Sequence, residues 1–327
     1  MSANVVYGEV DGLGETFGKF IVMTMDVPWG LVKDRLGGKP VKVVMTEGLE
    51  SEYLDGLVRD LPQVDTVVGI GGGVSIDTAK YFAWKRGCKA VFIPTIVSVN
   101  AYATPGAAVR YSGKVSYPGN VIPEKIIIDY QAIQSAPKRL NTAGCGDIYS
   151  CRTALFDWKL AHEKNGEWYD DKVAGESRRI LSTLVSNAGE IKNVTEKGIR
   201  TLVQLHIDTN TVQLAAKSPR PEEGSEHLYF YTLEELTGRT FVHGETVGTG
   251  IYILTHFQNN EEGVVEKEMD AMGLLFRPKE YGVTHDEFVN TVLGMKRYSQ
   301  EAKSMFSIVN VVDISREDAD LLWKKLN

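Results

Sequence analysis

The stretch that decides the fold of this chain reads Val64-Asp-Thr-Val-Val-Gly-Ile-Gly-Gly-Gly-Val-Ser-Ile-Asp-Thr-Ala-Lys80. Its apolar, β-branched start is typical of a strand buried on both faces of a parallel sheet. Three glycines follow, and then a helix is predicted from Ser75 to Trp84. Because bare backbone N–H groups and the positive end of a helix both favour an anion, the stretch predicts a phosphate-binding turn. Ser75 or Asp77 is expected to cap the first turn of this helix.

The role of the glycine run stays open at this point. The run departs from the dinucleotide fingerprint Gly-x-Gly-x-x-Gly, because Val74 stands where the last glycine would fall. Three glycines can also make a plain tight turn between a strand and a helix. We expect a nucleotide site, but not one of the usual Rossmann form.

Length, charge and cysteine content restrict the class of protein. A chain of 327 residues is long enough for two domains. A formal net charge of −7, without clustered Lys and Arg, argues against a nucleic-acid partner. The apolar stretches are too short for a membrane span, and the first residues lack the pattern of a secretory signal. Three cysteines predict a reducing cytoplasm, with Cys145 and Cys151 as small buried residues rather than ligands.

The order of predicted elements indicates an α/β fold. Strand-like and helix-like segments alternate up to residue 129, which predicts a Rossmann-like parallel sheet with helices on both faces. Within residues 107–118 this alternation is interrupted by Tyr-Ser-Gly-Lys between apolar residues, which predicts a β-hairpin. Nearly every later segment has helical spacing. We predict a nucleotide-binding domain at 1–136 and an all-helical domain at 137–327, with the site in a cleft between them.

Three motifs of the helical half place a possible metal ligand in or beside a glycine-rich helix start. They are Gly144-Cys-Gly-Asp147, Gly224-Ser-Glu-His227 and His243-Gly-Glu-Thr-Val-Gly248. One Asp and two His, with a fourth position open, have the composition of a catalytic divalent site. Taken singly, Asp147 fits a helix N-cap and each histidine fits an ordinary, partly buried side chain. Their joint appearance favours metal binding.

The order of the motifs along the chain resembles a known superfamily. The motifs are Gly-Gly-Gly-x-x-x-Asp-x-x-Lys at 71–80, Pro94-Thr95-x-x-Ser98, Ala143-Gly-x-Gly-Asp147 with Asp157-Trp158 downstream, Gly224-Ser-Glu-His227 and Val242-His-Gly-Glu-x-Val-Gly248. From about residue 5 to residue 258, the chain is similar to the iron-containing alcohol dehydrogenase and dehydroquinate synthase-like superfamily. Within it the chain most resembles the glycerol-1-phosphate dehydrogenase group, followed by glycerol dehydrogenase.

This resemblance implies an activity and its cofactors. It implies a homo-oligomeric oxidoreductase that transfers a hydride between a nicotinamide cofactor and a secondary hydroxyl of a polyol or polyol phosphate. The N-terminal domain would bind the nicotinamide dinucleotide, and the helical domain would bind the substrate and one divalent metal ion. Zinc is expected, with iron or nickel as alternatives.

The resemblance also implies the site residues. The metal-ligand and catalytic roles fall to Asp147, His227 and His243, and Asn100 is expected to meet the substrate. The cofactor roles fall to Asp26, Gly71, Gly72, Gly73, Asp77, Thr95, Ser98 and Thr104. An acid at Asp26 would accept from a ribose 2′-OH and repel a 2′-phosphate, which favours NAD over NADP. Asp26 also fits a solvated loop acid before Pro28.

Two positions depart from the pattern of the superfamily. Relatives typically have an aspartate that meets substrate hydroxyls where this chain has Asn100, and Asn cannot supply a negative charge. After His227, Leu-Tyr-Phe-Tyr-Thr stands in place of the Ser-His common in the phosphate-substrate group. A phosphorylated and a free polyol therefore both stay open. So do two other functions, namely a dehydroquinate synthase-like cyclase that uses NAD transiently and a non-catalytic nucleotide-binding relative.

Overall fold

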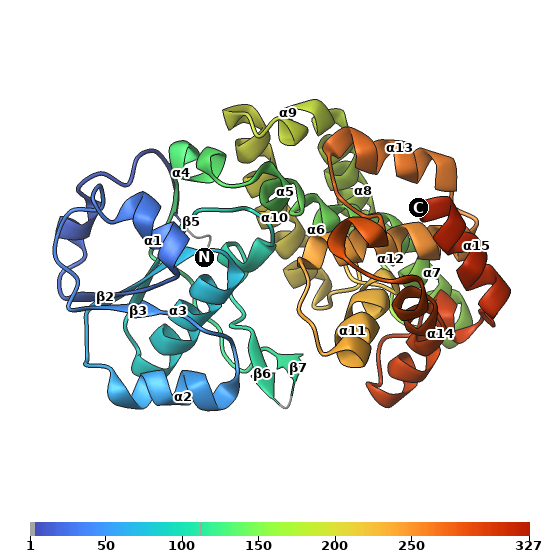
Figure 1. The fold of residues 1–327 in the computed structure, drawn as a ribbon, viewed down its shortest axis with the longest axis horizontal. Helices are drawn as coiled ribbons and strands as arrows, with labels where there is room; N and C mark the ends of the chain where they lie inside the picture. The colour runs from blue at the N-terminus through green and yellow to red at the C-terminus, as the bar shows by residue number, and fades with distance from the viewer. Residues whose placement is uncertain (1–3, 112) are drawn as a thin grey trace. The chain divides into compact units, whose positions relative to one another are not determined.

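A six-stranded sheet with the strand order β1-β8-β5-β4-β2-β3 organises the N-terminal part of the chain (Figure 1). The structure is a computed structural model and describes residues 4–111 and 113–327. All neighbouring strands of the sheet are parallel. The strands are β1 (Val5–Tyr7), β2 (Phe20–Thr24), β3 (Lys42–Met45), β4 (Thr66–Gly71), β5 (Lys89–Pro94) and β8 (Lys125–Ile128). The predicted α/β fold is confirmed.

Helices cover both faces of this sheet. On one face, Val22 and Val68 of the strands pack in a cluster with Val32 at the end of α1. On the other face, Gly69 is so close to α3 that a Cβ on it would lie 3.0 Å from Cβ of Ala79. Burial on both faces explains the continuous β-branched runs of the strands. The helices of this part are α1 (Asp26–Val32), α2 (Ser51–Asp60), α3 (Gly73–Arg86) and α4 (Tyr130–Ser135), with 3-10 turns at η1 (Leu13–Thr16) and η2 (Asn100–Tyr102).

A separate hairpin interrupts the alternation, as the sequence predicts. Its antiparallel strands are β6 (Val109–Tyr111) and β7 (Lys114–Ser116). Val109 packs against Leu54 and Tyr81, which anchors the hairpin to α2 and α3. Ser112 of the predicted turn lies outside the described residues.

Residues 138–327 form a second compact unit, separated from the first between Pro137 and Lys138. This unit contains helices and no strand, and no described helix of the chain is long and apolar enough to cross a membrane. The helical spacing of the sequence predicts one helix from Asp147 to Ala161, whereas the structure has two helices, α6 and α7, with an interruption at Ser150. The helices are α5 (Lys138–Thr142), α6 (Cys145–Tyr149), α7 (Cys151–Asn165), α8 (Asp171–Ser186), α9 (Ala188–Lys192), α10 (Glu196–Ala216), α11 (Glu226–Thr237), α12 (His243–Gln258), α13 (Glu262–Met272), η3 (Pro278–Tyr281), α14 (His285–Glu301), η4 (Ile308–Asn310) and α15 (Arg316–Leu326).

Candidate active site

The glycine run forms the tight turn between β4 and α3. Gly71 has a φ of +139°, a conformation that side-chain-bearing residues rarely adopt, and a Cβ on it would lie 2.9 Å from Oγ of Ser75. A Cβ on Gly72 would lie 2.8 Å from Cδ1 of Ile96. Gly72 and Gly73 are only half-buried, so their backbone N–H groups at the start of α3 are open to a ligand.

Ser75 and Asp77 do not cap α3, contrary to expectation. The helix begins two residues earlier than predicted, at Gly73, and its N-cap Gly72 has no side chain to offer. Oδ1 of the buried Asp77 accepts hydrogen bonds from Nζ of Lys80 (2.8 Å) and from the amide of Ala108 (3.3 Å). Lys80 also donates to the carbonyl of Gly106 (2.7 Å). Asp77 and Lys80 therefore attach the helix after the glycine turn to the loop before the hairpin.

The other predicted cofactor residues gather at the carboxyl ends of neighbouring strands. Thr95 follows β5, and its amide donates to the carbonyl of Gly71 (3.2 Å). Asp26 follows β2 as the exposed first residue of α1. The next two strands along the chain, β3 and β4, lie on opposite sides of β2. The carboxyl ends of β2 and β4 therefore form the switch point at which open α/β sheets bind ligands.

Ser98, Asn100 and Thr104 lie on the segment that follows β5. Ser98 is buried, and Asn100 is the half-buried first residue of η2. The carbonyl of Asn100 accepts from the amides of Ala103 (2.8 Å) and Thr104 (3.1 Å), which closes a tight turn. The hydrogen bond from Thr95 to Gly71 joins the start of this segment to the glycine turn.

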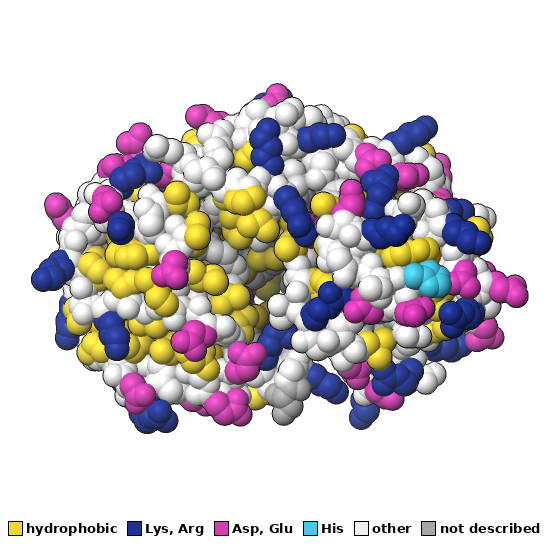
Figure 2. All heavy atoms as spheres, in the orientation of Figure 1, with side chains coloured by type: hydrophobic (Ala, Val, Ile, Leu, Met, Phe, Trp, Pro, Cys, Tyr) yellow, Lys and Arg dark blue, Asp and Glu magenta, His cyan; other side chains and the backbone are white. Residues whose placement is uncertain are grey.

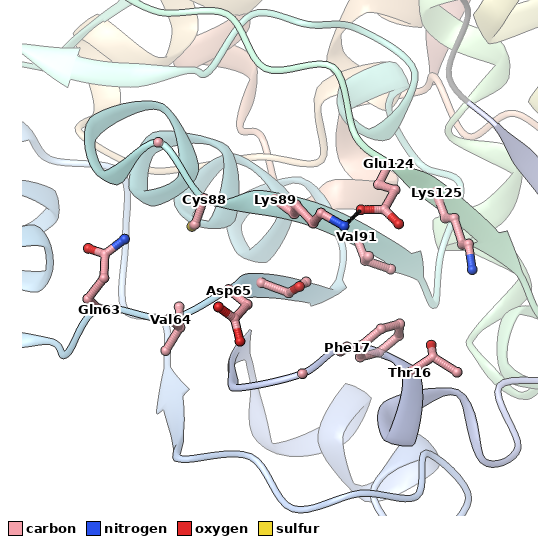
Figure 3. A pocket seen from close by; sticks show the side chains of 13 residues that line it. Thr16, Phe17, Gln63, Val64, Asp65, Cys88, Lys89, Val91, Glu124 and Lys125 are labelled. Atoms are coloured by element: carbon pink, nitrogen blue, oxygen red, sulfur yellow. Dashed lines mark ion pairs between the residues drawn. The ribbon is translucent and has the colours of Figure 1, made fainter.

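A pocket of about 610 Å³ lies elsewhere on the N-terminal unit (Figure 3). Its lining includes Asp65 and Thr66 at the start of β4 and Lys89 and Lys125 at the starts of β5 and β8. It therefore opens at the amino ends of the strands. Because the strands are parallel, this edge is opposite to the one that holds the glycine turn.

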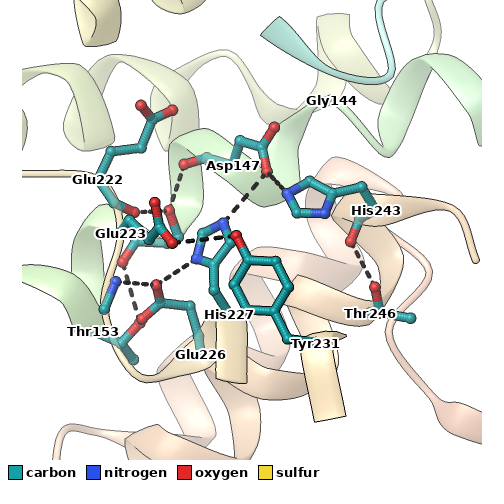
Figure 4. A network of polar contacts seen from close by, with 12 residues as sticks. Gly144, Asp147, Thr153, Glu222, Glu223, Glu226, His227, Tyr231, His243 and Thr246 are labelled. Atoms are coloured by element: carbon teal, nitrogen blue, oxygen red, sulfur yellow. Dashed lines mark hydrogen bonds and ion pairs between the residues drawn. The ribbon is translucent and has the colours of Figure 1, made fainter. Parts of the chain in front are cut away.

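Asp147, His227 and His243 come together within the helical unit (Figure 4). One ligand atom from each can be chosen so that all three lie within 4.8 Å of one another. Nε2 of His243 is 2.9 Å and Nε2 of His227 is 4.0 Å from Oδ1 of Asp147. Asp147 is not an N-cap, because Gly144 holds that position of α6. Asp147 and His227 are buried, whereas His243 is half-buried and open to a ligand.

The donor set fits a divalent cation. No described residue gives Oδ1 of Asp147 a well-directed hydrogen bond, although this atom is buried and His243 is close. A buried carboxylate oxygen without a well-directed donor is suited to coordinate a cation. Burial opposes ionisation, but the imidazoles of His243, His227 and His206 outweigh it and lower the pKa of Asp147. A carboxylate with two imidazoles is a common ligand set for catalytic zinc and related metals.

Glu226 determines how His227 presents its ring. Its Oε1 lies 2.8 Å from Nδ1 of His227 and accepts from the amide of Gly224, while Oε2 accepts from Oγ1 of Thr153. The hydrogen bond to Glu226 assigns the proton to Nδ1 and leaves Nε2 for a metal. Burial lowers the pKa of His227, but Glu226, Glu223 and Asp147 more than reverse this and raise it to about 9. The same negative charges favour a bound cation.

Glycines let the three ligand-bearing helices approach one another. A Cβ on Gly146 would collide with the backbone of Gly244, and a Cβ on Gly244 would collide with the carbonyl of Ala143. These contacts place Asp147 of α6 beside His243, the first residue of α12. Gly250 of α12 is equally close to the carbonyl of Glu226 on α11.

The sequence did not indicate several supporting residues. Nε2 of the fully buried His206 lies 3.0 Å from the carbonyl of Gly144, at the start of the helix that carries Asp147, and burial lowers the pKa of His206. Glu226 stands next to His227 in the sequence, and this adjacency was an available signal. Cys145 and Cys151 are buried and unpaired, as expected.

Comparison with known proteins gives consistent similarities. A family model described as iron-containing alcohol dehydrogenase matches residues 24–137. The glycerol-1-phosphate dehydrogenase [NAD(P)+] of Aeropyrum pernix is 32% identical over 264 residues, which cover 80% of this chain and 74% of the relative. The enzyme of the same name from Hyperthermus butylicus is 31% identical over 252 residues, which cover 76% of this chain and 72% of the relative.

The fold is also similar to solved structures. A probable glycerol dehydrogenase from Sinorhizobium meliloti gives a TM-score of 0.74 at 18% identity, covering 99% of this chain and 96% of that one. Glycerol dehydrogenase from Schizosaccharomyces pombe gives a TM-score of 0.72 at 18% identity, covering 100% of this chain and 89% of that one. At this identity the likeness is one of fold.

Proposed function

This chain belongs to the iron-containing alcohol dehydrogenase family, and from that premise we propose a metal-dependent dehydrogenase that transfers a hydride between a nicotinamide cofactor and a secondary hydroxyl of a polyol or polyol phosphate. The observation that carries the proposal is the cluster of Asp147, His227 and His243, with a buried carboxylate oxygen that receives no well-directed hydrogen bond from any described residue. The names of the relatives, glycerol-1-phosphate dehydrogenases, support a polyol phosphate.

In this proposal the three clustered residues hold one divalent cation, with zinc first and iron or nickel as alternatives. The cation would lower the pKa of the substrate hydroxyl in one direction and polarise the ketone in the other. Asp147 supplies a carboxylate at neutral pH, because its pKa is lowered. With a cation bound in place of the second ring proton, Glu226 would keep the remaining proton of His227 on Nδ1, which leaves Nε2 as the ligand atom. Because His243 is half-buried, a substrate could reach a cation held at its ring.

We propose that the N-terminal unit binds the cofactor at the switch point of its sheet. The amides after Gly71 would hold the pyrophosphate at the start of α3. Asp26 would accept from the adenine ribose, which favours NAD, with NADP possible at lower affinity. Exposed apolar side chains beside Asp26 suit an adenine ring, namely Met25 (45% exposed), Val27 (75%) and Met45 (41%). Figure 2 shows hydrophobic side chains gathered over this unit, on the left of the view.

Three further statements complete the proposal. The enzyme works in the cytoplasm, where the unpaired Cys88, Cys145 and Cys151 would stay reduced. It works as a homo-oligomer, which rests on its family resemblance. Its partner is a small molecule rather than a nucleic acid, in keeping with a net charge of −7.

The test is a panel of free polyols, sugar alcohols and their phosphates, with NAD⁺ or NADP⁺ and with zinc, iron or nickel. Absorbance of the reduced nicotinamide reports the reaction. Net formation of NADH or NADPH with a polyol or its phosphate is the expected result. Product without net reduced cofactor would instead support a cyclase, and tight NAD binding without any product a non-catalytic relative.

A further inference from the structure

Glu223 lies beside the three clustered residues without being one of them. Figure 4 shows it next to His227, on the segment that leads into α11. Its side chain is half-buried. Glu223 can therefore contact both the protein and a small molecule bound at the cluster.

Tyr231 holds one oxygen of this carboxylate. It follows His227 by one helical turn of α11, and its hydroxyl donates to Oε1 of Glu223 at 3.3 Å. The ring of Tyr231 stacks on that of Tyr298 from α14, with centroids 6.0 Å apart and 9° between the planes. Because this ring is supported by stacking, the hydroxyl can fix the direction of the Glu223 carboxylate.

The second oxygen of Glu223 is open. Among residues 4–111 and 113–327, none donates a hydrogen bond to Oε2 or offers it a cation. Glu226 and Asp157 nearby are different, since both are fully buried and both their oxygens accept hydrogen bonds from the protein. Glu223 thus has one oxygen held by Tyr231 and a second oxygen that can still accept a hydrogen bond.

We propose that Glu223, oriented by Tyr231, accepts a hydrogen bond from a free hydroxyl on the carbon next to the reacting carbinol. A carboxylate can only accept, so this position selects a donor. Glu223 is then a specificity-determining residue that favours vicinal diols and α-hydroxy ketones over simple alcohols and ketones. The inference rests on the proposed function, in which the cluster binds the reacting oxygen. It holds for free and phosphorylated polyols alike, because both retain such a hydroxyl.

The experiment uses ketone pairs that differ by one free hydroxyl. Hydroxyacetone is compared with acetone, and dihydroxyacetone phosphate with hydroxyacetone phosphate. Each reduction consumes one NADH and one proton and forms the alcohol and NAD⁺. We expect Glu223→Gln to lower kcat/KM by about 10- to 100-fold for the hydroxyl-bearing member and by less than about threefold for its partner, the size expected for a charged hydrogen bond.

Two more variants and a metal measurement complete the design. The ratio of kcat/KM for the hydroxyl-bearing ketone to that for its partner should also fall in Tyr231→Phe, but by a smaller factor. This variant keeps the Glu223 carboxylate and removes only the hydrogen bond from the Tyr231 hydroxyl. Glu235→Gln, on the exposed side of α11 where Glu235 pairs with Arg297, should leave the ratio unchanged. Elemental analysis should find the same metal content in all three variants as in the wild type.

Each outcome decides the inference. An equal loss for both members of a pair, or no loss in Glu223→Gln, would overturn it while leaving the proposed function intact. Failure of the wild type to reduce any of the four ketones would overturn the inference together with the proposed function on these substrates. A selective loss for the hydroxyl-bearing members with metal retained would support both.

Discussion

Glu226 is the residue on which the orientation of His227 depends. It is fully buried and accepts from Gly224, Thr153 and the Nδ1 side of His227. A partner of this kind fixes the tautomer of a ligand histidine and strengthens its bond to metal. We predict that Glu226→Gln weakens zinc binding by about 10- to 100-fold.

Competition with a chromophoric chelator measures this affinity. Glu235→Gln is the matched control, because Glu235 is exposed on the same helix. Unchanged zinc affinity in Glu226→Gln would show that the hydrogen bond to His227 does not support metal binding.

Asp26 is expected to set the choice of cofactor. Its exposed carboxylate at the end of β2 would repel a 2′-phosphate. We predict that Asp26→Ser lowers the ratio of kcat/KM for NAD⁺ to that for NADP⁺ by about tenfold or more, equivalent to about 1.4 kcal/mol. Asp34→Ser, an exposed acid just after α1, should not change the ratio. An equal ratio in both variants would remove Asp26 from the cofactor site.

The sequence indicated the three clustered residues but not their supports. Asp147, His227 and His243 could be selected because each is a ligand type in or beside a glycine-rich helix start. Glu223 and His206 could not be selected, since an isolated Glu or His in a sequence has no visible partner. His206 meets Gly144 across 62 positions, and Thr153 meets Glu226 across 73. Only the packing of the helices brings such pairs together.

Glycine residues allow the starts of α6 and α12 to lie in direct backbone contact. Gly244 follows His243 directly in the sequence. A Cβ on Gly244 would collide with the carbonyl of Ala143. We predict that Gly244→Ala lowers the free energy of unfolding by about 1–3 kcal/mol, as overpacking does, and weakens zinc binding as well. Denaturant unfolding and chelator competition measure the two effects.

Gly175→Ala is the control for this substitution. Gly175 lies inside α8 with no atom within 4 Å of an added Cβ, so alanine should stabilise the protein by about 0.5–1 kcal/mol. If Gly244→Ala were as stable as Gly175→Ala and bound zinc normally, the glycine contact would not position His243.

Asp157 joins three segments of the helical unit and is expected to make stability depend on pH. Its carboxylate accepts from the amide and hydroxyl of Ser225 and from the amide of Ile308. Burial, and then the charge of Glu226, raise the pKa of Asp157 from 3.8 to about 7. The folded protein therefore holds this proton more tightly than the unfolded chain, and the resulting stabilisation is lost as pH rises from about 4 to 7.

We predict that the free energy of unfolding of the wild type, relative to that of Asp157→Asn, falls by up to about 1.4 kcal/mol per pH unit between about pH 4 and pH 7. Urea unfolding of both proteins at pH 5, 6, 7 and 8 measures the difference. A difference that does not change with pH would contradict a protonated Asp157.

The sequence predicted the types of the elements better than their ends. Strands such as β4 are continuous apolar runs, and most helices show clear spacing. The helix break at Ser150 was missed, because Cys145–Asn165 has no proline or glycine after Gly146 to mark it. The hydroxyl proton of Ser150 is shared between the carbonyl of Asp147, one turn earlier, and that of Glu222, which only tertiary packing brings close.

The two units divide the proposed reaction between them. The sheet of the first unit brings Asp26, the glycine turn and Thr95 to neighbouring strand ends, as cofactor binding requires. The helices of the second unit bring Asp147, His227 and His243 together without any residue of the first. In the proposed reaction the first set would hold the cofactor and the second set the metal. Metal binding by the second unit should therefore be measurable without cofactor.

The most direct test of a catalytic metal at this cluster is NADH-linked turnover after metal removal. The wild type is stripped with a chelator and assayed with the best substrate of the panel, before and after one equivalent of zinc, iron or nickel is added. We predict that turnover disappears on stripping, returns with metal, and is not restored in His243→Ala at the same metal concentration. Undiminished turnover in the stripped wild type, or wild-type turnover in His243→Ala, would contradict the assignment of Asp147, His227 and His243 as the metal site.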